Sequence, residues 1–213
     1  MNPEVVEAVA RAVRGGGCLR DVSAVVAEAL RGAWGVEVVE DGFCVRDPVA
    51  AALWLVSRGV SEGAVAGFLD WRMFEEYAAR AFDEAGFTVY RGLRRYGRGG
   101  FQVDVLALDG YGRGVVVECK HWSPRHSNPS RLRVAAERHV ERTRRLAGAW
   151  DKLGLPRPGR GRVRLLPALL VLRSTGLPRL LAGVPVISVS RLKGFIEALD
   201  ALIYSGEVVV MEA

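Results

Sequence analysis

Amide side chains are nearly absent from this 213-residue sequence. Gln102 is the only glutamine, and Asn2 and Asn128 are the only asparagines. Lysine is also scarce, at three residues against 27 arginines. Few amides together with abundant charge are typical of proteins from thermophiles, although an unusual codon composition would produce the same excess of arginine.

Cysteine is scarce too, and its spacing argues against several kinds of scaffold. Cys18, Cys44 and Cys119 are odd in number and form no closely spaced pair, so we expect no disulfide framework, zinc ribbon or iron–sulfur site. No apolar run approaches the roughly 18 residues that a membrane span needs. The N-terminus lacks the charged and apolar blocks of a signal peptide. These absences predict a cytoplasmic protein with no membrane contact.

What the chain does contain is enough apolar sequence for a well-packed core. Half of its residues are hydrophobic and a quarter are charged, which is typical of a soluble globular protein. The charge is unevenly distributed. Residues 1–70 carry 10 acidic and 6 basic side chains, whereas residues 120–164 carry 13 basic and 3 acidic ones. A segment with a net charge of +10 favours a polyanionic partner.

Residues 1–69 predict a small helical or winged-helix-like domain. An apolar stripe indicates a helix over residues 3–14, and Asp47 can cap a later one. Asp41-Gly42 separates two short apolar strands, which indicates a hairpin. Such a unit suggests DNA reading, but its negative charge argues against contact with phosphates. We therefore expect it to contact another protein or to serve packing.

Residues 70–213 alternate between helical and strand patterns, which predicts an α/β domain. Helices are expected at 70–85, 131–153 and 191–203, and strands at 87–91, 165–172, 184–189 and 207–211, with two more strands inside 101–120.

The strand pair within residues 101–120 carries the most informative side chains. A Gly-rich turn around Tyr111 joins its two apolar halves. If the hairpin is symmetric about Tyr111, Asp104 lies opposite Glu118 and Gln102 lies opposite Lys120, all on one face. Two carboxylates opposite each other repel, and a divalent cation between them would turn that repulsion into binding. This face is therefore the candidate catalytic face.

The order of these elements resembles the restriction-endonuclease-like superfamily, the PD-(D/E)xK nucleases, and most closely its Mrr-like branch. The residues that carry the resemblance are Glu75 on the first helix, Asp104 on a strand, and Glu118-Cys119-Lys120 at the end of the next strand. The resemblance covers residues 72–172 and implies a mixed central sheet flanked by helices. The sequence departs from the family pattern at one point, because no proline precedes Asp104.

The resemblance also implies a role for each of these residues. Asp104, Glu118 and the backbone carbonyl of Cys119 would bind Mg²⁺, for which Mn²⁺ would substitute. Lys120 would orient or deprotonate the attacking water, or stabilise charge at the phosphorus. Glu75 would complete the metal site or anchor Lys120, although a glutamate in a first helical turn is also favourable for the helix dipole alone.

Basic residues around this face are the candidate DNA contacts, because phosphate neutralisation dominates nucleic-acid affinity. They come from the loop before the hairpin, from the hairpin, from the basic helix and from the loop after it. The candidates are Arg94, Arg95, Arg98, Gln102, His121, Arg131, Arg138, Arg142, Arg145, Arg160 and Arg162. His126 and His139 show no metal-ligand spacing, and we expect both on the surface.

The sequence thus predicts a Mg²⁺-dependent DNA endonuclease of the restriction or repair type. A nuclease of the Holliday-junction-resolvase kind and a non-cutting DNA-binding or assembly subunit on the same fold are the alternatives, and RNA as substrate stays open. Asp104, Glu118 and Lys120 could also be an ordinary ion cluster, but burying such charges without a metal is costly. Cutting both strands calls for two active sites, which favours a homodimer.

Overall fold

A computed structural model describes residues 2–61, 64–65, 67–120, 129–158, 161–171 and 178–213 of the chain. The chain divides into two compact units, Met1–Phe74 and Glu75–Ala213, with the boundary inside one helix. Among the described residues, none of the helices combines the length and the apolar character needed to cross a bilayer.

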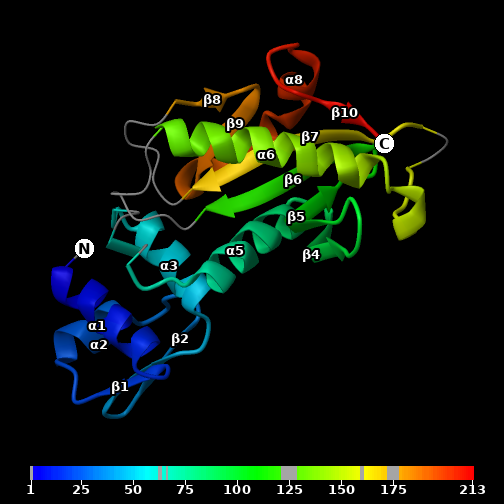
Figure 1. Cartoon of the computed structure of the whole chain (residues 1–213). Helices are drawn as coiled ribbons and strands as arrows, with labels where there is room; N and C mark the ends of the chain where they lie inside the picture. The colour runs from blue at the N-terminus through cyan, green and yellow to red at the C-terminus, as the bar shows by residue number, and fades with distance from the viewer. Residues whose placement is uncertain (1, 62–63, 66, 121–128, 159–160, 172–177) are drawn as a thin grey trace. The chain divides into compact units, whose positions relative to one another are not determined.

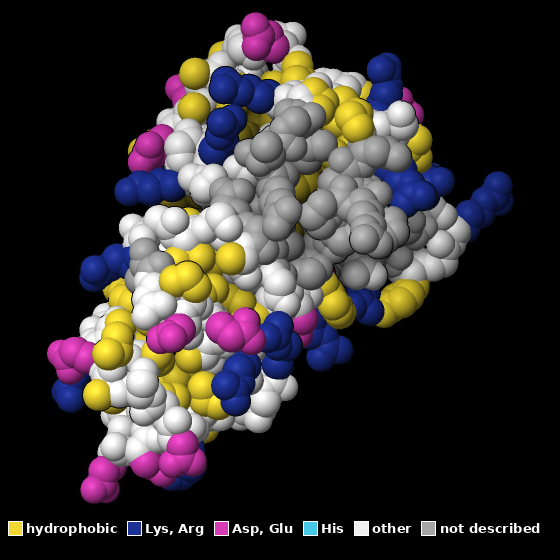
Figure 2. Space-filling model, turned by 90° about the vertical axis from the view of Figure 1, so that its left-hand side faces the viewer, with side chains coloured by type: hydrophobic (Ala, Val, Ile, Leu, Met, Phe, Trp, Pro, Cys, Tyr) yellow, Lys and Arg dark blue, Asp and Glu magenta, His cyan; other side chains and the backbone are white. Residues whose placement is uncertain are grey.

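The N-terminal unit combines short helices with a small sheet (Figure 1). Its elements are α1 (Pro3–Arg14), β1 (Cys18–Arg20), α2 (Ala24–Ala29), β2 (Val36–Val39), β3 (Gly42–Val45) and α3 (Pro48–Ser57). The Asp47 carboxylate accepts hydrogen bonds from the amides of Val49 and Ala50 and so caps α3 as expected. Figure 2 shows acidic side chains spread over the visible surface of this unit, with arginines between them.

A strand that the sequence did not predict completes the small sheet. β1 pairs with β3, so that the sheet order is β1–β3–β2. This pairing places Cys18 directly opposite Cys44, and the two are joined by a disulfide. The expectation of no disulfide is therefore wrong. Separation in sequence hid the pair, because the two cysteines are 26 positions apart and become neighbours only when β1 joins the sheet.

The second unit is built on a mixed sheet in the order β4–β5–β6–β7–β9–β8, with β10 paired to β7. Its strands are β4 (Thr88–Arg95), β5 (Phe101–Leu108), β6 (Arg113–Lys120), β7 (Arg164–Val171), β8 (Leu180–Leu181), β9 (Val184–Ser188) and β10 (Met211–Glu212). Strands β4, β5 and β6 are antiparallel neighbours, whereas β6, β7 and β9 run parallel. The predicted α/β class with a mixed central sheet is confirmed.

Helices flank this sheet (Figure 1). They are α5 (Trp71–Glu84), which begins in the N-terminal unit, α6 (Pro129–Ala147), α7 (Leu192–Glu197) and α8 (Leu199–Tyr204), with 3₁₀ turns η1 (Asp151–Leu153) and η2 (Val189–Arg191). α6 packs along β5 and β7, where Leu132 and Ala136 meet Leu169 of β7. Trp150, beyond the end of α6, is buried in a core with Leu106.

The register of the central hairpin follows the predicted symmetry. Val105 pairs with Val117, Leu106 with Val116, and the pairing continues to the turn. In that turn the Asp109 carboxylate accepts hydrogen bonds from the amides of Tyr111 and Arg113, and Gly112 has a φ of 84°, a conformation that favours glycine.

The strand before the hairpin is longer than predicted. β4 runs to Arg95, and Arg94 and Arg95 pair with Gln102 and Phe101. The first four residues of the segment expected to be a basic loop, 92–100, are therefore strand, and residues 96–100 turn back.

Candidate active site

The site begins where the β5–β6 ladder ends. The last recorded backbone pair is Val105–Val117, and the same register carried one residue further places Asp104 opposite Glu118. There the Cys119 amide donates a hydrogen bond to Asp104 Oδ2 at 2.9 Å. The Asp104 carboxylate thus accepts a hydrogen bond from a backbone amide where the strand pairing ends, and this bond fixes the direction of the carboxylate.

A glycine leaves room on the other side of Asp104. In the β4–β5 ladder the pairs Arg91–Val105 and Leu93–Val103 flank Gly92, which therefore lies across from Asp104. Gly92 has a φ of 59°, and a Cβ built there would meet no atom within 4 Å. The space beside this carboxylate is consequently not filled by a side chain from β4.

Glu118 is almost fully buried and is surrounded by cationic groups. Its side chain is 5% exposed. One carboxylate oxygen accepts a hydrogen bond from Lys120 Nζ, and the other forms an ion pair with an Arg142 guanidinium nitrogen at 2.9 Å. Burial would raise the pKa of Glu118, but the hydrogen bond and charge of Lys120, followed by the charge of Arg142, outweigh it, so the pKa is lowered. Glu118 is therefore ionised at neutral pH.

His139 corrects one prediction, because it lies inside the protein and not on its surface. Its ring is fully buried, Nε2 lies 2.8 Å from the Val116 carbonyl, and Nδ1 lies 3.8 Å from Glu118 Oε2. Burial lowers the pKa of His139 to about 4, so the neutral ring donates from Nε2 to that carbonyl. The sequence contained a signal for this burial, because His139 has the helical spacing of the buried stripe of α6. That stripe consists of Leu132, Ala136, His139, Thr143 and Leu146.

Asp104 and Glu75 carry negative charge that is less well compensated. Burial, followed by the charge of Glu118, raises the pKa of Asp104. Burial, followed by the charge of Asp104, raises the pKa of Glu75. In the described part of the chain, Glu75 forms no ion pair and Asp104 accepts only the hydrogen bond from Cys119. The structure therefore brings the predicted carboxylates together, and among the described residues two of them form no ion pair.

The donor set fits a small hard cation. Among the described residues, no three His, Cys, Asp or Glu side chains converge closely enough to hold an ion by themselves. Mg²⁺ does not require this, because it is commonly held by one or two carboxylates while keeping several waters. Burial raises the pKa of the Cys119 thiol well above its ordinary value. Cys119 would therefore contribute to a metal site only through its carbonyl oxygen and not as a thiolate.

A pocket of about 470 Å³ opens beside these residues. Glu118 and Lys120 line it from β6, and Arg131, Arg138 and Arg142 line it from α6. Between the arginines, Val134 is exposed. Two of the predicted catalytic residues, Glu118 and Lys120, thus share a surface depression with three of the predicted DNA contacts.

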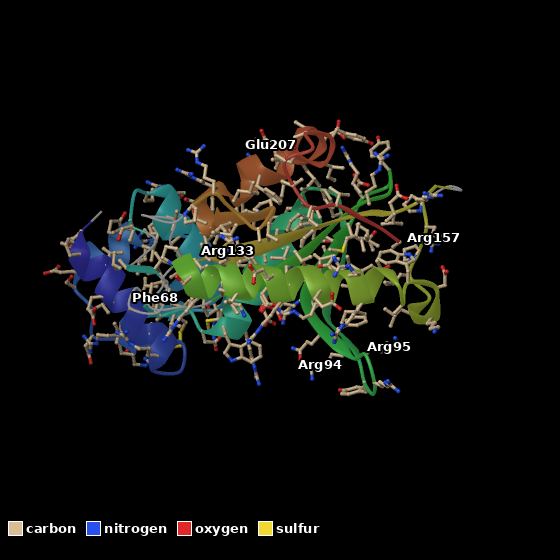
Figure 3. The ribbon with its side chains drawn as sticks, turned by 45° about the horizontal axis from the view of Figure 1, so that its top comes forward. Phe68, Arg94, Arg95, Arg133, Arg157 and Glu207 are labelled. Carbon is tan, nitrogen blue, oxygen red and sulfur yellow. A yellow bond between two sulfur atoms is a disulfide. The ribbon has the colours of Figure 1, made fainter. Side chains whose placement is uncertain are left out.

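The β4–β5 hairpin brings further predicted contacts to the same unit (Figure 3). Burial and the charge of Asp104 raise the pKa of Glu75, and the positive charges of Arg91 and Arg94 offset part of that rise, so both arginines lie near the carboxylates. Arg98 and Gln102 are exposed, whereas Arg95 is half-buried. Tyr96 at the hairpin tip is 83% exposed, so an aromatic ring stands beside the arginines.

Other predicted DNA contacts have partners within the protein. Arg145 donates to the Glu141 carboxylate at 3.1 Å and to the Gly100 carbonyl at 3.4 Å, which ties α6 to the hairpin. Arg162 binds Glu212 at 2.5 Å. His121 and Arg160, also predicted to contact DNA, lie outside the described residues.

α6 carries more internal ion pairs than the sequence suggested. Arg133 pairs with Glu137, and Arg144 and Arg145 pair with Glu141. These ion pairs lie on the exposed surface of the helix, so Glu137 and Glu141 are occupied by arginines of α6 itself. Arg138, in contrast, has no ion pair in the described part of the chain.

A family model of known proteins matches the middle of the chain. Residues 68–147 match the family model described as restriction endonuclease, which represents the Mrr catalytic domain. This segment contains α5, the strands β4 to β6 and α6, and so includes every predicted catalytic residue. No curated protein matches the chain.

Two solved structures are similar at low sequence identity. One is Can2 from Sulfobacillus thermosulfidooxidans in complex with cyclic tetra-adenylate, with 12% identity, a TM-score of 0.41, and coverage of 94% of this chain and 51% of that one. The other is protein VC1899 from Vibrio cholerae, with 9% identity, a TM-score of 0.41, and coverage of 96% and 51%. The present chain spans about half the length of each.

Proposed function

Because residues 68–147 of this chain belong to the restriction endonuclease family, in the Mrr-like branch of the PD-(D/E)xK nucleases, we propose that the protein is a Mg²⁺-dependent DNA endonuclease. It hydrolyses phosphodiester bonds by direct attack of water. The observation that carries the proposal is the meeting of Asp104, Glu118 and Lys120 at the end of the β5–β6 hairpin, beside a pocket lined by arginines.

The residues divide the work between them. Asp104, Glu118 and the Cys119 carbonyl would hold Mg²⁺, and Glu75 adds negative charge near Asp104. Mg²⁺ in such a site acts as a Lewis acid and lowers the pKa of bound water. Lys120 stands next to Glu118, where its ammonium group can orient the attacking water and stabilise the charge that develops on the phosphate.

The arginines supply affinity for the DNA backbone. Arg131 and Arg138 lie in the same pocket as Glu118, so a phosphate that contacts them is brought to the carboxylates. Arg94 and Arg98 on the hairpin side extend the basic surface. These contacts neutralise phosphates and carry no base information, so they position a duplex without selecting its sequence.

The test is cleavage of plasmid and short duplex DNA by purified variants with Mg²⁺ or Mn²⁺. Asp104→Ala and Glu118→Ala should abolish cleavage while keeping much of the DNA affinity. The matched control is Asp151→Ala, which removes an exposed acid of the same unit whose side chain is 82% exposed and should leave cleavage unchanged. If both site variants cut at the wild-type rate, the assignment is wrong.

The range of substrates and the assembly state complete the test. Linear, flapped and four-way DNA should be compared with single-stranded RNA, using the wild-type chain and Asp104→Ala side by side. Since cutting both strands needs two sites, we expect the protein to be dimeric when it cuts, which a sizing measurement with DNA would detect. Silence on every substrate with either ion would favour a non-cutting role.

A further inference from the structure

Glu118 is bound more tightly by cations of its own chain than the other carboxylates of the site. Lys120 binds Oε1, and Arg142 binds Oε2 at 2.9 Å. Asp104 and Glu75 have no ion-pair partner in the described part of the chain. An ion that binds between Asp104 and Glu118 must therefore compete with Arg142 and Lys120 for one of its two carboxylates, whereas Asp104 is free to receive it.

Arg142 differs from Lys120 in how it is held. Its guanidinium binds Glu118 through a terminal nitrogen, while Nε is buried and has no hydrogen-bond acceptor in the described structure. A guanidinium has five N–H donors in a fixed fork, and at least one donor of Arg142, the buried Nε–H, has no acceptor among the described residues. A buried donor without an acceptor is costly, and an arrangement that satisfies it would be preferred.

Arg142 also reaches the surface on which DNA would lie. Its side chain is 30% exposed, and it lines the pocket of about 470 Å³ together with Arg131 and Arg138. A phosphate in this pocket would offer Arg142 two acceptor oxygens that match the guanidinium fork bidentately. Arg142 thus stands between two competing anions, the Glu118 carboxylate and a DNA phosphate.

We propose that Arg142 is a positioning residue that holds Glu118 in the DNA-free protein and exchanges it for a phosphate when DNA binds. This exchange frees Glu118 Oε2 for the divalent cation, so DNA binding and cation binding strengthen each other. The inference rests on the proposed function for the identity of the anion. Coupling of this kind is reciprocal, because each ligand changes the affinity for the other by the same factor.

The first measurement is Mn²⁺ binding to the full chain without DNA, followed by the electron paramagnetic resonance signal of free Mn²⁺. Arg142→Gln removes the competing charge, so its dissociation constant for Mn²⁺ should fall about tenfold relative to the wild type. This corresponds to about 1.4 kcal/mol. Arg142→Lys keeps the charge as a compact ammonium, so its dissociation constant for Mn²⁺ should lie between those of the wild type and Arg142→Gln. Glu118→Gln should lose the site and so identify the signal.

The second measurement is DNA binding in the presence of a chelator, with a fluorescent duplex. Arg142→Gln should bind DNA more weakly than the wild type, so this one substitution changes the two affinities in opposite directions. The matched control is Arg138→Gln, which removes an arginine from the same helix and pocket but not from Glu118. It should weaken DNA binding and leave the Mn²⁺ dissociation constant unchanged.

A purely structural role for Arg142 predicts the opposite result for the ion. If Arg142 only keeps Glu118 in place, Arg142→Gln should bind Mn²⁺ more weakly, and that outcome overturns the proposal. If this variant fails to fold, the wild-type chain can be titrated with Mn²⁺ with and without a saturating deoxynucleoside monophosphate, which has no phosphodiester bond to cut. The nucleotide should tighten Mn²⁺ binding beyond its own chelation, and an unchanged affinity overturns the proposal.

These readouts need no catalysis, so they separate this inference from the nuclease assignment. A chain that cuts no DNA but shows opposite effects in Arg142→Gln would retain the exchange and lose the proposed function. A chain that cuts DNA but binds Mn²⁺ equally well with and without Arg142 would retain the function and lose the exchange.

Discussion

Replacing Asp104 with asparagine should make the second unit more stable when no divalent cation is present. Burial, followed by the charge of Glu118, raises the pKa of Asp104 above its ordinary value of 3.8. An acid whose pKa is higher in the folded state than in the unfolded one costs stability when it is ionised. Asparagine removes this charge and keeps an oxygen for the Cys119 amide, which lies 2.9 Å from the carboxylate.

The size of the gain follows from what is removed and what is kept. The hydrogen bond and the shape of the side chain stay, and only the charge is lost. Relief of a single unfavourable active-site group commonly yields about 1 kcal/mol. For a chain of 213 residues, about 1 kcal/mol raises the midpoint of thermal unfolding by roughly 2–4 °C.

The pH dependence gives the sign of the effect independently. Below the ordinary pKa of 3.8, Asp104 is protonated in both the folded and the unfolded chain, so wild type and variant should not differ through this group. As the pH rises, the wild type ionises and loses stability, while Asp104→Asn does not. The difference in free energy of unfolding should therefore grow from pH 4 towards neutrality.

Calorimetry in a chelating buffer measures the midpoint, and amide hydrogen exchange over residues 101–120 assigns the change to the second unit. The matched control is Asp109→Asn in the same hairpin. Asp109 is also buried, but it binds Arg113 and accepts two turn amides, so this substitution should destabilise the unit by about 1–3 kcal/mol.

With added Mg²⁺ the wild type should become more stable than Asp104→Asn. An ion that binds only the folded state stabilises it, and the variant has lost one of the carboxylates that would bind the ion. If Asp104→Asn is destabilised in the chelating buffer at neutral pH, or if its difference from the wild type does not change with pH, Asp104 and Glu118 do not repel each other in the folded protein.

Three other perturbations test separate parts of the structure. His139→Gln should flatten the decline in urea-measured stability between pH 6.5 and about 4, because the folded state lowers the pKa of His139 over that interval and the unfolded state therefore takes up the proton first; an unchanged slope would contradict its burial. Replacing Cys18 and Cys44 with serine should cost the N-terminal unit about 3 kcal/mol, since their disulfide has a sequence separation of 26 residues, and hydrogen exchange in the second unit should not change. Arg138→Gln should weaken binding to all duplex sequences alike and reduce the slope of log affinity against log salt by about 0.9; loss of affinity for one sequence only would indicate base reading.

The central hairpin could be predicted because its determinants are local. The turn residues Asp109 to Gly112 set the register, and strand alternation then determines which side chains share a face. The observed pairs, such as Val105 with Val117, agree with the symmetry predicted about Tyr111. Asp104 and Glu118 are brought together by this local geometry, which is why the candidate site could be located before the fold was known.

The surroundings of the site could not be predicted in the same way. His139 was expected on the surface and lies buried against Glu118 instead, and the pairing of Arg142, a predicted DNA contact, with the same carboxylate was not foreseen. Their positions depend on how α6 is rotated on the sheet, which packing against β5 and β7 decides. The helical spacing of the buried stripe contained this information for His139, but a histidine within an arginine-rich helix did not stand out as a buried residue.

Local chemistry in the sequence thus determined the α/β class, the hairpin and the carboxylates that face each other across it, because turns and strand alternation act over a few residues. Only the tertiary structure decided that Arg142 and Lys120 share Glu118, that β4 carries Arg94 and Arg95 as part of a strand, and that Cys18 meets Cys44. These arrangements join residues far apart in the chain, and their geometry is set by packing and pairing between whole elements, which no short stretch of sequence encodes.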